Sequence, residues 1–161
     1  MQTYFPLFVN LDQKKILVYG AGKIATRRIT GILRFGASVV VKAPHIQKEI
    51  WELQKHYTTR LFIEQRPYQC DEIQKKGADL VLAATNDKQI NEMICIECRR
   101  KGIPVNNASD SSQCDFYFPA LVELDQLVIG ITSTAGSHKK VAKVSEALRH
   151  PDFLYGKKEE Q

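Results

Sequence analysis

Short apolar runs alternate with amphipathic segments along the first two thirds of the chain. Runs of aliphatic and β-branched residues indicate strands buried inside a sheet. Such runs occupy residues 14–20, 38–44, the start of 61–68, 78–85 and 103–108. Strands separated by helices pair in parallel through right-handed crossovers. The pattern therefore predicts an α/β fold built on a doubly wound parallel sheet.

Apolar residues recur at helical spacing between these strands. A second helix is predicted over residues 46–57, a short third one over 69–77 and a fourth over 86–102. Asn86 or Asp87 is the expected N-cap of the fourth helix. The first predicted helix has one apolar face, formed by Ile24, Ala25, Ile29, Ile32 and Leu33.

The rhythm changes after the fifth strand. Two apolar runs, at residues 116–122 and 127–131, are joined by a connection too short for a helix and predict an antiparallel hairpin. A final helix begins near Ser137. We therefore divide the chain into residues 1–113, which carry the parallel sheet, and residues 114–161, which carry the hairpin and the last helix.

A glycine-rich motif joins the first strand to the first helix. The segment GAGKIA fits the pattern G-x-G-x-x-[GA], and its position between strand and helix makes the match informative. Gly20 permits the tight turn, Gly22 lets the backbone approach a pyrophosphate, and Ala25 allows close packing. The helix N-terminus, with Lys23 and Ile24, presents N–H groups to phosphates. We expect a Rossmann-like domain that binds a dinucleotide here.

The identity of the dinucleotide is less constrained. Rossmann domains commonly hold the ribose 2′-hydroxyl with an acid about 20 residues beyond the glycines. Lys42 stands there instead, and it would either contact a 2′-phosphate or lie in solvent, so NAD and NADP both stay open. Thr85 and Asn86 follow the fourth strand and are expected to contact the cofactor.

Two cysteines lie in a C-x-x-C arrangement, Cys95 and Cys98. The sequence has no second pair at zinc-ribbon spacing, and this pair closes a predicted helix, whereas redox pairs open one. We therefore expect reduced structural thiols and no metal site.

Length, composition and charge limit the classes of partner and the compartment that the chain can have. The chain has 161 residues and a formal net charge of +5, which admits nucleic acid, an acidic membrane surface or a polyanionic small molecule as partners. No apolar run approaches the roughly 18 residues of a membrane span, and the first residues do not resemble a secretory signal. The sequence predicts a cytoplasmic protein that binds no membrane.

Polar residues gather at two further places. One group follows the fifth strand, and the other follows the predicted hairpin. Ligands of doubly wound sheets lie beyond the carboxyl ends of the strands, where the first group belongs. The two groups contain Asn106, Ser109, Asp110 and Asp115, and Ser133, Ser137 and His138.

Several segments together resemble one known family, the N-terminal domain of siroheme synthase, which is precorrin-2 dehydrogenase. They are FPLFVNLDQKKILVYGAGKIATRR, FGASVVVKAP, AATND, CDFYFPA and LVIGITSTAGS, in the order and at the spacing of the family. The resemblance implies NAD-dependent oxidation of precorrin-2 to sirohydrochlorin. It also implies a homodimer formed through the part that follows the Rossmann domain. Some members also insert Fe²⁺, and some are fused to a methyltransferase, for which 161 residues leave no room.

The resemblance also suggests residue roles. Asp110 is the expected general base and Asp115 the fallback, because Ser109 stands where the family often has Asp. Ala135 and His138 replace a Gly and a Pro of the family pattern. The expected substrate contacts are Asn106, Ser133, Ser137 and His138.

Two other functions stay open. One is a bifunctional dehydrogenase and sirohydrochlorin ferrochelatase, and the other is an NAD(P)-sensing module without chemistry. No nucleic-acid motif is present, and a dinucleotide and a polycarboxylate tetrapyrrole suffice to explain the basic excess. We therefore expect no nucleic acid partner.

Overall fold

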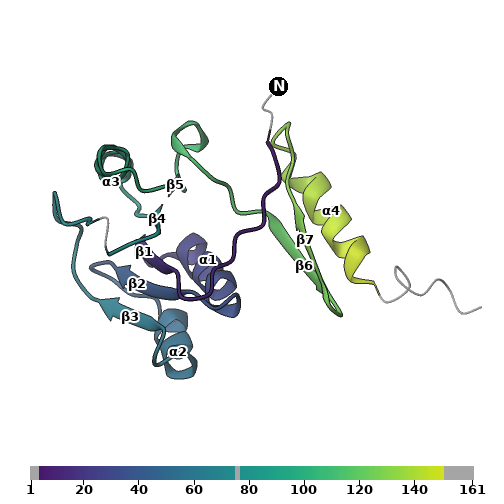
Figure 1. Ribbon diagram of the computed structural model, residues 1–161, viewed down its shortest axis with the longest axis horizontal. Helices are drawn as coiled ribbons and strands as arrows, with labels where there is room; N and C mark the ends of the chain where they lie inside the picture. Colours follow the sequence, from purple (N-terminus) through teal and green to yellow (C-terminus); the bar gives the residue numbers. More distant parts are fainter. Residues whose placement is uncertain (1–3, 75–76, 151–161) are drawn as a thin grey trace, which may run out of the picture. The chain divides into compact units, whose positions relative to one another are not determined.

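The computed structural model describes residues 4–74 and 77–150. The chain forms two compact units (Figure 1). The larger unit is Val9–Tyr117, and within the described chain the smaller one combines residues 4–8 with residues 118–150.

The larger unit is built on a five-stranded parallel sheet in the order β3-β2-β1-β4-β5. Three α-helices connect its strands (Figure 1). This architecture confirms the predicted doubly wound α/β fold. The strands are β1 (Lys15–Tyr19), β2 (Ser38–Lys42), β3 (Leu61–Glu64), β4 (Leu80–Ala83) and β5 (Val105–Asn107), and the helices are α1 (Lys23–Arg34), α2 (Lys48–His56) and α3 (Lys88–Lys101).

The first helix, α1, buries most of its predicted apolar face. Ala25, Ile29, Ile32 and Leu33 are buried, as expected, but Ile24 is 48% exposed. The prediction for Ile24 was wrong because it lies about 100° around the helix from Ala25, at the margin of the buried stripe.

The third α-helix, α3, is capped by Asp87 at its N-terminus and ends at Gly102, which has φ +64°. The Asp87 carboxylate accepts hydrogen bonds from the backbone N–H groups of Gln89 and Ile90 at 2.8 and 3.2 Å. Of the two predicted N-caps, Asp87 is therefore the one that caps α3.

Cys95 and Cys98 are buried in the core beside the sheet, and burial raises the pKa of these thiols to about 11 and about 12.

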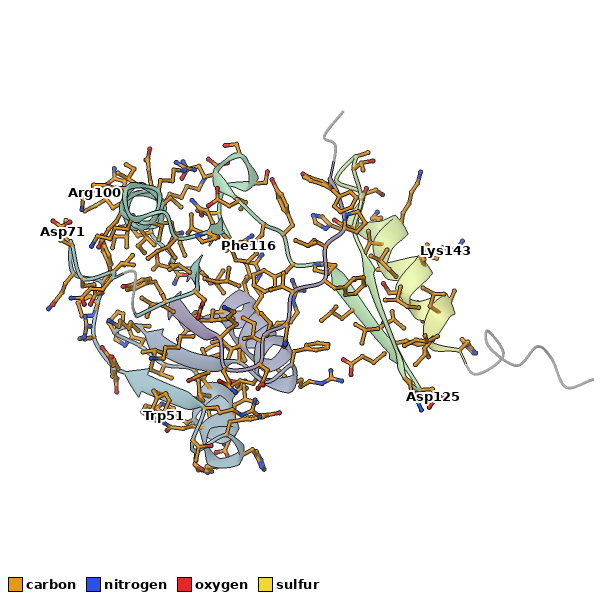
Figure 2. All side chains as sticks on the ribbon, in the orientation of Figure 1. Trp51, Asp71, Arg100, Phe116, Asp125 and Lys143 are labelled. Atoms are coloured by element: carbon orange, nitrogen blue, oxygen red, sulfur yellow. The ribbon has the colours of Figure 1, made fainter. Side chains whose placement is uncertain are left out.

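The predicted helix at residues 69–77 does not form over residues 69–74, which are a turn and irregular backbone; residues 75–76 lie outside the described chain. The cause is Glu97 of α3, only 3% exposed, whose carboxylate accepts the Asp71 and Ile73 backbone N–H groups at 3.2 and 2.8 Å. Asp71 also forms an ion pair with Arg100 (Figure 2). Tertiary contacts therefore replace the helical hydrogen bonds.

The smaller unit contains a hairpin and a helix. Strands β6 (Ala120–Leu124) and β7 (Leu127–Ile131) pair antiparallel, and α4 (His138–Arg149) packs against β6. The structure confirms the hairpin and the final helix, with Ser137 at the N-cap position. The first strand begins at Ala120 rather than at residue 116.

Two further findings concern the described residues as a whole. Across residues 4–74 and 77–150, no helix combines the length and the apolar character needed to cross a bilayer. Over the same ranges, no group of three or more His, Cys, Asp or Glu side chains is placed to hold a metal ion.

The hydrogen bonds that Glu97 accepts lead to a prediction about the stability of the fold. Its carboxylate also accepts from the Tyr68 hydroxyl at 2.5 Å and pairs with Lys101 at 3.0 Å. Loss of a buried charged acceptor costs about 2–4 kcal/mol. Glu97→Ala should lower the free energy of unfolding by that amount in urea denaturation followed by circular dichroism. The matched control is Glu92→Ala, at an exposed position of the same helix. Equal losses of stability in both variants would show that these hydrogen bonds of Glu97 do not stabilise the fold.

Candidate dinucleotide site

The loop after β1 is held tightly between two neighbouring strands. The Gly20 N–H donates to the Lys42 carbonyl at the end of β2 at 2.9 Å, and the Ala84 N–H donates to the Tyr19 carbonyl at 2.7 Å. Gly20 has φ +106°, and a Cβ there would lie 2.1 Å from the Ala84 carbonyl oxygen. Both the backbone conformation and the space therefore require glycine at this position.

The second glycine of the motif faces open space. Gly22 is the N-cap of α1, and a Cβ built on it would meet no heavy atom within 4 Å. The first turn of α1 holds no acidic residue, so nothing there opposes an anion at the helix N-terminus. The residues therefore fit a dinucleotide, whose pyrophosphate would lie against the Gly22 backbone.

The other motif residues divide by exposure. Ala25 is fully buried, which allows α1 to pack closely against the sheet, whereas Lys23 and Ile24 are exposed at the helix start. Lys42 forms ion pairs with Glu72 and Glu64. The roles predicted for Lys23, Ile24 and Lys42 toward the cofactor stay predictions.

A buried amide, Asn91, organises the loops beyond β4 and β5. Its Oδ1 accepts from the Thr85 N–H at 3.0 Å and from the Thr85 hydroxyl at 2.7 Å, and its Nδ2 donates to the Thr85 carbonyl and the Ser109 hydroxyl, both at 3.1 Å. Asn91 therefore fixes Thr85, while Asn86 lies exposed beside it. Sequence reasoning missed Asn91; the available signal was an amide on the face of the helix that carries Ile94 and Cys95.

The proposed base, Asp110, lies just beyond β5 and caps the short 3-10 helix η1 (Ser111–Gln113). Its Oδ1 accepts from the Ser112 N–H at 2.9 Å and from the Ser112 hydroxyl at 2.7 Å. These bonds hold the pKa of Asp110 below its usual value, so the carboxylate is ionised at neutral pH. Its catalytic role stays a prediction.

The fallback base, Asp115, closes the open edge of β5. Its Oδ2 accepts from the Val105 N–H and its own N–H donates to the Val105 carbonyl, both at 2.9 Å. The Cys114 thiol lies 3.2 Å from both the Asn107 nitrogen and the Asn107 carbonyl oxygen. Asp115 thus satisfies backbone groups that an edge strand otherwise leaves unpaired.

Asn106 of β5 is 2% exposed and binds both α1 and the segment that follows η1. Its Oδ1 accepts from Arg28 Nη1 at 2.6 Å, and its Nδ2 donates to the Phe116 carbonyl at 2.7 Å. Burial lowers the pKa of Arg28. Arg28 is therefore engaged in holding β5, while Lys23 and Arg27 remain exposed on α1. A substrate contact by Asn106 stays a prediction.

In the smaller unit, Ser133 shapes the loop that leads into α4. Its hydroxyl accepts from the Ala135 and Ser137 N–H groups at 3.2 and 2.9 Å, around Gly136 at φ +70°. His138 is exposed in the first turn of α4. Substrate binding by Ser133, Ser137 and His138 stays a prediction.

Fold and loop together define a dinucleotide-binding Rossmann domain, and comparison with known proteins agrees. A family model described as putative NAD(P)-binding matches residues 7–120. Among the solved structures, "SirC, precorrin-2 dehydrogenase" superposes with a TM-score of 0.74 at 28% identity, covering 90% of this chain and 69% of that one.

Curated relatives point the same way. The "Probable multifunctional siroheme biosynthesis protein HemA" of Ruminiclostridium josui is 40% identical over 146 residues, which are 90% of this chain and 28% of that protein. The siroheme synthase of Pseudomonas fluorescens is 35% identical over 130 residues, 81% of this chain and 27% of that protein. The chain thus spans less than a third of these relatives. It belongs to the NAD(P)-binding family that includes precorrin-2 dehydrogenase and the N-terminal domain of siroheme synthase.

The two glycines generate opposite predictions. Gly22→Ala should fold with a stability within about 1 kcal/mol of the parent, because its Cβ enters open space. It should nonetheless raise the Kd for NAD⁺ at least about tenfold by blocking the pyrophosphate. Gly20→Ala should instead lose about 2 kcal/mol of stability through strain. Calorimetric titration and urea denaturation measure both effects; unchanged NAD⁺ affinity in Gly22→Ala would exclude this loop as the site.

Proposed function

We propose that this chain is a precorrin-2 dehydrogenase, which oxidises precorrin-2 to sirohydrochlorin with NAD⁺. The observation that carries the proposal is the open Gly22 backbone at the N-terminus of α1, in a chain related to SirC. When bound, NAD⁺ supplies the hydride acceptor. The protein must then orient the tetrapyrrole and accept a proton.

Asp110 is the proton acceptor in this proposal. It lies beyond the carboxyl end of β5, where ligands of doubly wound sheets bind. Both hydrogen bonds from Ser112 reach Oδ1, so Oδ2 is available for the proton. Asn106, Ser133, Ser137 and His138 are the proposed contacts to the substrate.

The direct test adds precorrin-2 to the purified chain with NAD⁺, and in parallel with NADP⁺, and follows the absorbance of the reduced nucleotide. Reduction supports the dehydrogenase. Binding of NAD⁺ without reduction would favour a sensing module instead. Adding Fe²⁺ after the oxidation tests the bifunctional alternative, in which sirohaem forms faster than without protein. We further expect the activity in the cytoplasm.

Asp110→Asn tests the base. Asparagine keeps the cap of the 3-10 helix but removes the proton acceptor, so turnover should fall about 100-fold or more, with the Kd for NAD⁺ unchanged. Asp12→Asn removes an exposed carboxylate next to Gly36, before the sheet, and serves as the control. Turnover of Asp110→Asn equal to that of the control would exclude Asp110 as the base.

The smaller unit supports a homodimer. In its described residues only Val122 and Ser145 are buried, while Leu127, Val128 and Val144 are 52%, 40% and 47% exposed. With Val122 as the one buried apolar side chain among its described residues, this hairpin and helix gain little stability from apolar burial of their own. We therefore propose that a second copy covers this unit, with residues 1–113 binding NAD and residues 114–161 providing dimerisation and substrate contacts.

Val128→Arg tests the dimer. Light scattering after gel filtration should give twice the 18.3 kDa chain mass for the parent protein and a shift to monomer for the variant. Met93→Arg places the same side chain on α3 of the larger unit, at a residue 44% exposed, and should stay dimeric. A monomeric parent protein would contradict the homodimer.

A further inference from the structure

Four charged side chains gather at the carboxyl end of β2 and β3, and the proposed mechanism uses none of them. Lys42 Nζ lies 3.1 Å from Glu72 Oε2 and 3.6 Å from Glu64 Oε2. Arg66 Nη2 lies 2.5 Å from the same Glu72 oxygen and 2.8 Å from Glu64. The cluster therefore pairs two cations with two carboxylates and is close to neutral.

This cluster adjoins the dinucleotide loop. The Lys42 carbonyl accepts from the Gly20 N–H at 2.9 Å, and Lys42 is the register partner of Tyr19 at the end of β1. The end of β2 is the place where Rossmann domains distinguish a ribose 2′-hydroxyl from a 2′-phosphate.

The carboxylate comes from a distant part of the chain. Glu72 lies in the loop between β3 and β4, which the buried Glu97 anchors through the Asp71 and Ile73 backbone. Its Oε1 accepts from the Gln69 N–H at 3.2 Å. The side chains of Glu72 and Lys42 are each only 11% exposed, so water screens their attraction weakly.

We propose that Glu72, together with Glu64, makes the site select NAD over NADP by neutralising Lys42 and Arg66. The inference rests on the proposed function and deepens it. It assigns to the loop after β3 the carboxylate that many Rossmann domains carry on β2 itself.

The physical argument is a competition for the same cations. A 2′-phosphate is doubly charged and needs free cationic partners, but here it would meet two carboxylates and have to displace them from Lys42 and Arg66. A 2′-hydroxyl needs only a hydrogen-bond acceptor, which a carboxylate supplies. Partial burial alone would raise the pKa of Glu72, but the bonds from Arg66, Gln69 and Lys42 outweigh it and lower the pKa. The carboxylate is therefore ionised at neutral pH.

Glu72→Gln tests the selection. The amide keeps the shape of the side chain and removes its charge. Lys42 and Arg66 then share the Glu64 carboxylate alone within the cluster, which gains a net positive charge for a phosphate. Calorimetric titration of the full chain should show tighter binding of NAD⁺ than NADP⁺ in the parent protein. In Glu72→Gln the Kd for NADP⁺ should fall about tenfold, while that for NAD⁺ changes less than about threefold.

The control is Glu52→Gln, which removes a carboxylate from the exposed pair with Lys55, 2.9 Å apart, and should leave both Kd values unchanged. Glu64→Gln changes the more exposed partner and should shift the preference the same way by a smaller factor, which keeps the test decisive if Glu72→Gln fails to fold. An unchanged ratio of the two Kd values in the folded variants would overturn the selection alone. A parent protein that binds neither nucleotide would overturn the proposed function as well.

Discussion

The loop after β1 passes so close to the end of β4 that no side chain fits at Gly20, and the rest of the site depends on this contact. A Cβ would lie 2.1 Å from the Ala84 oxygen, so only glycine lets the loop turn at once into α1. The N-terminus of α1 then lies at the carboxyl edge of the sheet, between β2 and β4. Its N–H groups and partial positive charge favour an anion there, beside the exposed Lys23. The open space beside Gly22 leaves room for a pyrophosphate against the backbone.

Buried polar side chains hold the loops that follow β3, β4 and β5. Asn91 ties Thr85 to Ser109 beyond β4 and β5, and Glu97 anchors the segment between β3 and β4. Buried polar groups of this kind are costly unless every bond is made, so each permits few alternative loop conformations. The same anchoring places Glu72 beside Lys42, so the proposed selection of the cofactor would depend on Glu97 as well.

The net charge of the sequence does not show which basic side chains are already paired in the folded chain. The net charge of +5 suggested an anionic partner, yet Lys42 at the end of β2 and Arg66 after β3 are paired with carboxylates. Arg28, a further cation on α1, is bound to Asn106. Anion binding at this edge therefore depends on the backbone N–H groups of α1 and on the exposed Lys23 more than on Lys42, Arg66 or Arg28.

The sequence alone determined the order of strands and helices, the parallel sheet, the glycine loop and the hairpin with its final helix, because each depends on local periodicity or on a local backbone requirement. It failed at residues 69–74, where Glu97 of a later helix replaces helical hydrogen bonds, and at Ile24, at the edge of a buried stripe. The sequence also did not predict the hydrogen bonds of Asn91 or the ion pairs of Lys42. These features arise between residues far apart in the chain, and only folding brings their charges and hydrogen-bonding groups together.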